Sequence, residues 1–271
     1  MEKIKQALDR AGVARAIEEK DIKRHTLLQH TSDSDEMSRI IYTTTKTFKI
    51  SKDKLREQRV IASDSNDYIT DQYKVLRTQV LQRLKTNHWN SLAVTSPNEG
   101  SGKTLTAINL AISLAKEVNH SVLLVDMDLR RPTIHNYFFY ERQLGISEYL
   151  TGNNELSEIL VNPGIDRLVI LPGNESFANS SEMLSTPKMV RLVEELKSRY
   201  PNRIVIYDMP PLLSCDDMIA FAPYVDAVML VVEDESTRKD ELKRSFDLIK
   251  NYSVIGTVLN KSKVTRISYS N

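Results

Sequence analysis

Residues 96–104 read S-P-N-E-G-S-G-K-T, and this stretch decides the fold of the chain. It follows a short apolar run at 92–94 and precedes a segment whose apolar residues recur at helical spacing. A glycine-rich turn between a buried strand and a helix presents backbone N–H groups to an anion, and the helix dipole favours negative charge there. The stretch therefore predicts a phosphate-binding loop of a nucleotide site.

The residue types within this loop suit a nucleoside triphosphate. Gly100 and Gly102 let the backbone close around phosphates without Cβ clashes. Lys103 supplies positive charge for the β- and γ-phosphates, and the Thr104 hydroxyl supplies a ligand for Mg²⁺. The loop departs from the general pattern at Pro97, where glycine is usual. The residues predicted to contact nucleotide here are Asn98, Glu99, Gly100, Ser101, Gly102, Lys103, Thr104 and Leu105.

Two further apolar runs end in acidic residues. Residues 122–130 read V-L-L-V-D-M-D-L-R, and residues 204–211 read I-V-I-Y-D-M-P-P. Continuous apolar strands are typical of a parallel sheet buried on both faces, and ligands collect at the carboxyl ends of such strands. Asp126, Asp128 and Asp208 are therefore candidate site residues, and Asp126 and Asp208 join Thr104 as candidate Mg²⁺ ligands. The alternative for each aspartate is a strand-end turn or a helix cap.

The rest of the core alternates between strand and helix patterns. Such alternation predicts an α/β fold with a doubly wound, mainly parallel sheet flanked by helices. The expected strands are 168–171, 227–232 and 254–259, and the expected helices are 71–85, 188–197 and 237–250.

These motifs together resemble a known family. The loop, V-D-M-D-L-R-R-P-T-I-H (125–135) and Y-D-M-P-P (207–211) are similar to bacterial tyrosine kinases of the polysaccharide-export type. That family is a branch of the deviant P-loop ATPases that include MinD and ParA. G-I-S-E-Y-L-T-G (145–152), N-S-S-E-M-L-S (179–185) and G-T-V-L-N-K (256–261) extend the resemblance over residues 71–263. Within the family, the chain resembles the cytoplasmic, exosortase-associated, CapB-like autokinases.

The resemblance implies roles for individual residues. Asp126 becomes the candidate base for a tyrosine hydroxyl or water, with Asp128 and Asp208 completing the metal and water shell and Lys103 on the phosphates. Arg130 would stabilise the loop or reach a neighbouring subunit. Asn260 follows the last strand, where the family recognises adenine, although an ordinary turn residue is the alternative.

An interface and a phosphate acceptor also follow from the resemblance. Asp71, Lys74 and Arg77 repeat at the three-residue spacing that joins family subunits into a ring. The alternative is a solvated helix face whose i,i+3 ion pair contributes only a few tenths of a kcal/mol. Tyr269, the single tyrosine of the tail K-S-K-V-T-R-I-S-Y-S-N, is the candidate phosphate acceptor.

Three departures bear on the activity. Asn98 stands where MinD- and ParA-like proteins carry a signature lysine that reaches across a dimer, which argues against that mechanism. Met209 replaces the small hydroxyl residue usual in the kinases. The tail holds one tyrosine in place of the usual cluster, which puts autokinase activity in question more than ATPase activity.

Composition bounds the remaining possibilities. The chain has 271 residues with net charge +1, so charge gives no case for nucleic-acid binding. It holds one cysteine, Cys215, and no apolar run near the roughly 20 residues of a membrane span.

We predict an N-terminal extension (1–70) with an amphipathic helix at 4–17, a polar linker at 20–36 and an extended arm at 40–50. The kinase domain (71–263) and a tail (264–271) follow.

Three functions remain open at this point. The first is an ATP- and Mg²⁺-dependent tyrosine autokinase that regulates exopolysaccharide synthesis or export. It would act in the cytoplasm, as a homo-oligomer, bound to the inner membrane through a Wzz-type polysaccharide co-polymerase. The second is an ATPase switch that assembles with the same machinery without phosphorylating tyrosine. The third is a MinD- or ParA-like positioning ATPase.

Overall fold

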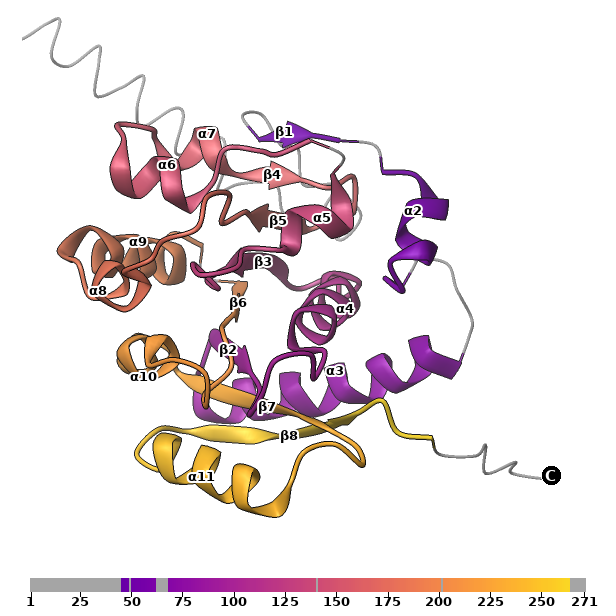
Figure 1. Ribbon diagram of the computed structural model, residues 1–271. Helices are drawn as coiled ribbons and strands as arrows, with labels where there is room; N and C mark the ends of the chain where they lie inside the picture. The colour runs from indigo at the N-terminus through magenta and orange to yellow at the C-terminus, as the bar shows by residue number, and fades with distance from the viewer. Residues whose placement is uncertain (1–44, 49, 62–67, 140, 201, 264–271) are drawn as a thin grey trace, which may run out of the picture. The chain divides into compact units, whose positions relative to one another are not determined.

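The computed structural model describes residues 45–48, 50–61, 68–139, 141–200 and 202–263. Over these residues the chain forms one eight-stranded sheet in the order β1-β4-β5-β3-β6-β2-β7-β8 (Figure 1). The strands are β1 (Lys46–Thr47), β2 (Ser91–Thr95), β3 (Ser121–Asp126), β4 (Val161–Asn162), β5 (Leu168–Leu171), β6 (Arg203–Asp208), β7 (Ala227–Glu233) and β8 (Val254–Asn260).

The pairing within the sheet confirms the predicted fold class. Every neighbouring pair runs parallel except β4 with β5, which is antiparallel. At the carboxyl ends of β3 and β6, Asp126 lies directly opposite Asp208. Adjacent parallel strands end at one edge of the sheet, so two acidic side chains far apart in sequence meet there.

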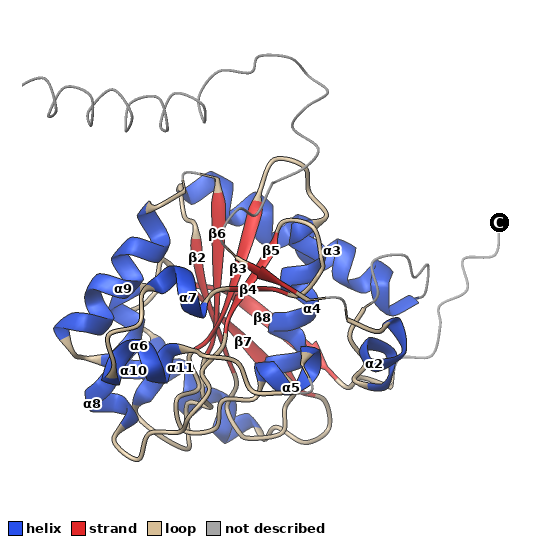
Figure 2. Ribbon diagram, turned by 90° about the horizontal axis from the view of Figure 1, so that it is seen from above, coloured by secondary structure: helices blue, strands red, loops and turns tan. Residues whose placement is uncertain are grey.

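Helices cover both faces of the sheet (Figure 2). One face carries α2 (Lys52–Glu57), α3 (Tyr68–Asn87), α4 (Lys103–Ala115) and α5 (Ile134–Phe138). The other carries α6 (Ile146–Thr151), α7 (Leu156–Ile159), α8 (Ser180–Leu184), α9 (Pro187–Ser198), α10 (Asp217–Phe221), the 3-10 turn η1 (Ala222–Tyr224) and α11 (Lys239–Ile249).

The inner strands β2, β3, β5, β6 and β7 are apolar between their ends because both of their faces are covered, whereas β1 and β8 are partly exposed. In β2, Leu92 and Val94 pack into the core beneath α4, whereas Ala93 packs into the opposite core. Side chains alternate between faces along a strand, so a strand buried on both sides has no position for a polar residue until it ends. In these inner strands the charged residues, such as Asp126, Arg203 and Asp208, therefore lie at the strand ends.

Part of the predicted extension is built into this fold. Among the described residues, β1 pairs with β4, and Leu55, Val60 and Ile61 are buried in the same core as α4. The domain boundary at residue 70 stays a prediction, although residues 55–61 on its N-terminal side contribute to the core. The predicted helix at 4–17, the linker at 20–36 and Tyr269 lie outside the described residues. Among the described helices, none has the length and apolarity needed to cross a membrane.

Candidate nucleotide-binding and phosphotransfer site

The phosphate-binding loop joins β2 to α4, as the sequence predicts. Gly100 and Gly102 adopt positive φ angles of 78° and 87°, which glycine reaches without strain. A Cβ atom at Gly102 would lie 2.2 Å from the Asn260 Nδ2 atom. That same Nδ2 group donates a hydrogen bond of 2.8 Å to the Ser101 carbonyl. Glycine at 102 is therefore required both by backbone conformation and by the close approach of Asn260 from β8.

Backbone hydrogen bonds tie this loop to the segment that follows β6. The Leu212 N–H donates to the Ser96 carbonyl at 2.8 Å, and the Leu213 N–H donates to the Pro97 carbonyl at 3.1 Å. The Thr95 hydroxyl donates to the Pro210 carbonyl at 2.7 Å. Proline at 97 keeps its carbonyl as an acceptor and restricts the backbone, so the departure from glycine fits a loop braced by its neighbour.

Lys103 lies at the centre of the site. Its Nζ atom is 2.9 Å from Asp128 Oδ2 and 3.5 Å from Asp208 Oδ1, and it lies 3.2 Å from the Thr104 hydroxyl. The Thr104 hydroxyl in turn donates to Asp208 Oδ2 at 2.6 Å. Burial alone would lower the pKa of Lys103, but Asp208 and Asp128 outweigh it and raise that pKa. Lys103 therefore stays cationic while it is held by carboxylates.

Asp126 and Asp208 are fully buried beneath Lys103 and Asp128. The Thr133 and Ile134 N–H groups donate to Asp126 Oδ2 at 2.8 and 2.9 Å. Among the described residues, Asp126 Oδ1 accepts no hydrogen bond, whereas Asp208 Oδ1 forms only the ion pair with Lys103 at 3.5 Å. Burial raises the pKa of Asp126, and the neighbouring Asp208 raises it further. Burial also raises the pKa of Asp208, partly offset by Lys103. Unpartnered buried oxygens of this kind mark a site with free capacity for a ligand or a proton.

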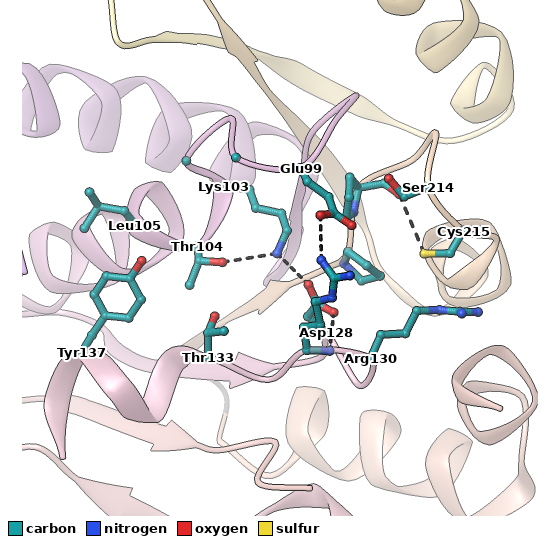
Figure 3. Close-up of a pocket in the computed structure, with 15 residues that line it drawn as sticks. Glu99, Lys103, Thr104, Leu105, Asp128, Arg130, Thr133, Tyr137, Ser214 and Cys215 are labelled. Atoms are coloured by element: carbon teal, nitrogen blue, oxygen red, sulfur yellow. Dashed lines mark hydrogen bonds and ion pairs between the residues drawn. The ribbon is translucent and has the colours of Figure 1, made fainter. Parts of the chain in front are cut away.

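A cavity of about 440 Å³ opens over these groups (Figure 3). The predicted site residues that line it are Glu99, Gly100, Gly102, Lys103, Thr104, Leu105, Asp128 and Arg130. Asn98, Ser101, Asp126, Asp208 and Asn260 do not line the cavity, although hydrogen bonds or ion pairs connect Ser101, Asp208 and Asn260 to residues of the loop. The predicted site residues therefore form two layers, one that lines the cavity and one, including Asp126 and Asp208, that is buried behind it.

Arg130 and the predicted interface residues are held by intramolecular contacts. The Arg130 guanidinium is turned away from Lys103 (Figure 3). It contacts the Asp217 carboxylate at 3.0 Å. On α3, Lys74 pairs with Asp71 at 2.9 Å, and their side chains are 43% and 62% exposed, respectively. Arg77 instead anchors α3 to α4, contacting the Ser113 carbonyl at 3.2 Å and Glu117 at 3.0 Å. The interface assignment stays a prediction, and only its first two residues are exposed.

Sequence reasoning missed several residues of the cavity wall. Tyr137, on α5, faces the cavity from the side of Thr104 and Leu105 (Figure 3). Burial, reinforced by Asp208, raises the pKa of the Tyr137 phenol. Cys215 also lines the cavity, and burial raises the pKa of its thiol to about 11. The helix α5 is too short for its sequence pattern to predict which way Tyr137 faces. Thr133, in contrast, belongs to the D-M-D-L-R-R-P-T motif that the sequence analysis identified.

The residues present fit a nucleotide with Mg²⁺. The positive-φ loop, the Lys103 ammonium and the Thr104 hydroxyl face the cavity together. Among the described residues, no cluster of three or more His, Cys, Asp or Glu side chains forms a ready metal cage. Mg²⁺ commonly keeps several waters and binds through one or two carboxylates plus substrate phosphates, so this donor set suits it.

Comparison with known proteins places the chain in a family. The model of the AAA domain matches residues 90–259. The kinase domain of VpsO is 30% identical, with a TM-score of 0.64 over 72% of this chain and 96% of that domain. The chain belongs to the bacterial tyrosine kinases. The expected resemblance, and the P-loop ATPase fold that it implied, are both confirmed.

Other members of this kinase family differ in length. Tyrosine-protein kinase YwqD of Bacillus subtilis is 28% identical, and the match covers 78% of this chain and 90% of YwqD. Tyrosine-protein kinase Etk of Escherichia coli K12 is 29% identical, but the match covers 75% of this chain and 28% of Etk. This kinase chain therefore spans most of a short relative and about a quarter of a long one.

A more distant likeness concerns the fold alone. The septum site-determining protein MinD of Pyrococcus horikoshii, a Mg-ADP complex, aligns with a TM-score of 0.53 at 22% identity. The match covers 64% of this chain. The kinase therefore shares its sheet architecture with MinD proteins, and this likeness carries nothing about activity.

Proposed function

We propose that this chain transfers the γ-phosphoryl group of ATP to tyrosine, as an autokinase that acts between copies of itself. Membership of the tyrosine-kinase family supports this proposal. The observation that carries it in the structure is the buried Asp126, whose Oδ1 is unpartnered and whose pKa is raised by burial and by Asp208. A carboxylate with a raised pKa is a stronger base for a phenol proton than an exposed one.

The proposed reaction begins with a change of partner at Lys103. Nucleotide phosphates compete with Asp128 and Asp208 for the ammonium group, which would draw Lys103 toward the loop and uncover Asp126. The tyrosine oxygen then attacks the γ-phosphorus, the bond to the β,γ-bridging oxygen breaks, and ADP leaves. Asp126 accepts the phenolic proton. When bound, Mg²⁺ neutralises the β- and γ-phosphate oxygens, and Thr104 and Asp208 would hold it.

The cellular setting is part of the same proposal. The relatives include the putative tyrosine-protein kinase CapB of Staphylococcus aureus, 26% identical over 74% of this chain. The chain would work in the cytoplasm beside the inner membrane and bind there through a Wzz-type polysaccharide co-polymerase. Its role would be to regulate exopolysaccharide synthesis or export. The solved chimerical protein CapA2B2 is 26% identical, with a TM-score of 0.69.

The experiment is phosphotyrosine mapping by mass spectrometry after incubation of purified chain with ATP and Mg²⁺. The expected result is phosphate on Tyr269, and Tyr269→Phe should remove most of the phosphotyrosine. A Tyr252→Phe variant is the matched control, because Tyr252 is a described, part-buried tyrosine outside the cavity. Absence of phosphotyrosine anywhere, with ATP still hydrolysed, would overturn the kinase proposal.

One observation favours a second function. The tail holds a single tyrosine, Tyr269, where a cluster is usual in the family. With so few acceptors, the chain would serve as an ATPase switch whose assembly with the membrane machinery follows its nucleotide state. ATP hydrolysis without phosphotyrosine, combined with nucleotide-dependent assembly, is the outcome that would establish this alternative.

A further inference from the structure

Arg130 lines the cavity and forms an ion pair with Asp217 that is separate from the contacts of Lys103. Arg130 follows β3, and its Nε and Nη2 atoms lie 3.1 and 3.0 Å from Asp217 Oδ1. Asp217 begins α10 and is completely buried, whereas the Arg130 side chain is 40% exposed. The pair therefore links an accessible cation on the cavity wall to an inaccessible carboxylate behind it.

The direction of Arg130 separates it from the nucleotide chemistry. Lys103 contacts Asp128 and Asp208, whereas Arg130 is turned toward Cys215 and α10 (Figure 3). Both contacts with Asp217 use the Nε and Nη2 side of the guanidinium. Nη1 forms no hydrogen bond or ion pair with the residues that the structure describes. The free edge and the planar face of Arg130 are thus available at the cavity mouth.

We propose that Asp217 is a positioning residue that holds Arg130 at the cavity mouth to receive the tyrosine-bearing acceptor segment. This inference rests on the proposed kinase function and deepens it. A guanidinium offers N–H donors to backbone carbonyls and a planar face to a phenol ring, so it suits a tyrosine segment arriving beside the nucleotide. Arg130 is the group that contacts the acceptor, and Asp217 acts through it.

Burial explains why Asp217 is suited to this task. A long exposed arginine samples many rotamers, and fixing it costs conformational entropy each time an acceptor binds. The buried carboxylate removes that cost beforehand by holding one side of the guanidinium with a charge-assisted contact. The adjacent Asp216 lies 3.7 Å from Arg130 Nη2 and is 70% exposed, so its attraction is screened by solvent. The two neighbouring aspartates form a matched pair for experiment.

The test measures phosphoryl transfer in trans. The donor is the full chain or a variant, and the acceptor is a Lys103→Met copy that carries a mass tag and is titrated in excess. Arg130→Ala should raise the apparent KM for the acceptor about tenfold, the size expected for loss of a charge-assisted contact. Asp217→Asn should raise it in the same direction, whereas Asp216→Asn should change it little. The Kd for ADP should change far less than the acceptor KM.

A double variant distinguishes positioning from a structural role. If Asp217 acts through Arg130, then Arg130→Ala with Asp217→Asn should be no worse than Arg130→Ala alone. Additive losses, or equal effects of Asp216→Asn and Asp217→Asn, would overturn the inference. If Asp217→Asn does not fold, Arg130→Lys tests the pair from its exposed end and should also raise the acceptor KM. A wild-type donor that phosphorylates no acceptor at all overturns the proposed function itself, and the inference with it.

Discussion

The aspartates at the two ends of the same sheet differ in how far their carboxylates are hydrogen-bonded. At the carboxyl end, Asp126 Oδ1 accepts no hydrogen bond from the described residues, Asp208 Oδ1 has only the ion pair with Lys103, and burial raises the pKa of each carboxyl group. At the amino end, Asp226 accepts hydrogen bonds from the Asn90 and Ser91 N–H groups and from Lys197. Burial works against the ionised form of Asp226, but Lys197 and these donors outweigh it and lower its pKa.

The difference shows that aspartate can stabilise the fold at one end of the sheet and form a candidate site at the other. Asp226 joins the starts of β2 and β7 to the end of α9, and its hydrogen-bonding capacity is used within the fold. The cluster at the carboxyl end, Asp126, Asp128 and Asp208, instead holds like charges close together beside Lys103. Such an arrangement contributes little to the stability of the fold in the absence of a ligand. The following predictions test this contrast, from the largest expected effect to the smallest.

The largest effect is expected from Asp126→Asn. An amide cannot accept the phenolic proton, so phosphotyrosine formation should slow by about 10²–10⁴-fold. The amide oxygen can still accept from the Thr133 and Ile134 N–H groups, and a like charge beside Asp208 is removed. The free energy of unfolding at neutral pH should therefore stay constant or rise. Quench-flow phosphotransfer and urea denaturation measure the two quantities, and an unchanged transfer rate would exclude Asp126 as the base.

Lys103→Met should give the next largest effect. The ammonium supplies charge to the phosphates, and loss of a comparable preorganised donor costs about 10²–10³ in rate. Isothermal titration with ATP and a coupled ATPase assay provide the measurement. Lys261→Met is the control, because Lys261 forms only a part-exposed ion pair with Glu233 at 2.9 Å. Full ATP turnover in folded Lys103→Met protein would remove the phosphate-site assignment.

Asp226→Asn should alter stability without altering chemistry. The amide loses the charge that Lys197 faces and leaves donors poorly matched, so the free energy of unfolding should fall by about 1–3 kcal/mol. Because the folded-state pKa of Asp226 is lowered, its contribution is present above the unfolded pKa of about 3.9 and is lost as pH falls through the folded value. Wild type and variant should therefore converge in acid. A stability gap that persists at low pH would contradict this account.

The smallest stability effect is expected on α3. Asp71→Ala with Lys74→Ala removes an exposed ion pair worth only a few tenths of a kcal/mol, so the melting temperature should barely move. If the stripe joins subunits, light scattering should nevertheless show a shift toward monomer. Arg77→Ala is the informative comparison, because it breaks the link to Ser113 and Glu117 and should lower the melting temperature. Wild type that is monomeric with and without nucleotide would rule the interface out.

The sequence was sufficient for most of the architecture. A glycine-rich loop between an apolar strand and a helix, followed by apolar runs ending in aspartate, predicted the parallel sheet and the family. These features are local, since backbone conformation and burial on two faces restrict each residue independently of its distant neighbours. The departures from the family pattern are also local, and the sequence alone shows Pro97 in place of glycine. Only the structure shows that the Pro97 carbonyl accepts a hydrogen bond from the Leu213 N–H.

The sequence alone determined which residues carry charge and where each strand must end, because periodicity and residue type are properties of short segments. Only the tertiary structure decided how those residues are layered. It buried Asp126 and Asp208 behind Lys103, opened the cavity to Asp128 and Tyr137, and turned Arg130 toward Asp217. Such arrangements depend on contacts between segments separated by tens of residues, and the free energy of a buried charge depends on its whole surroundings rather than on its neighbours in the chain.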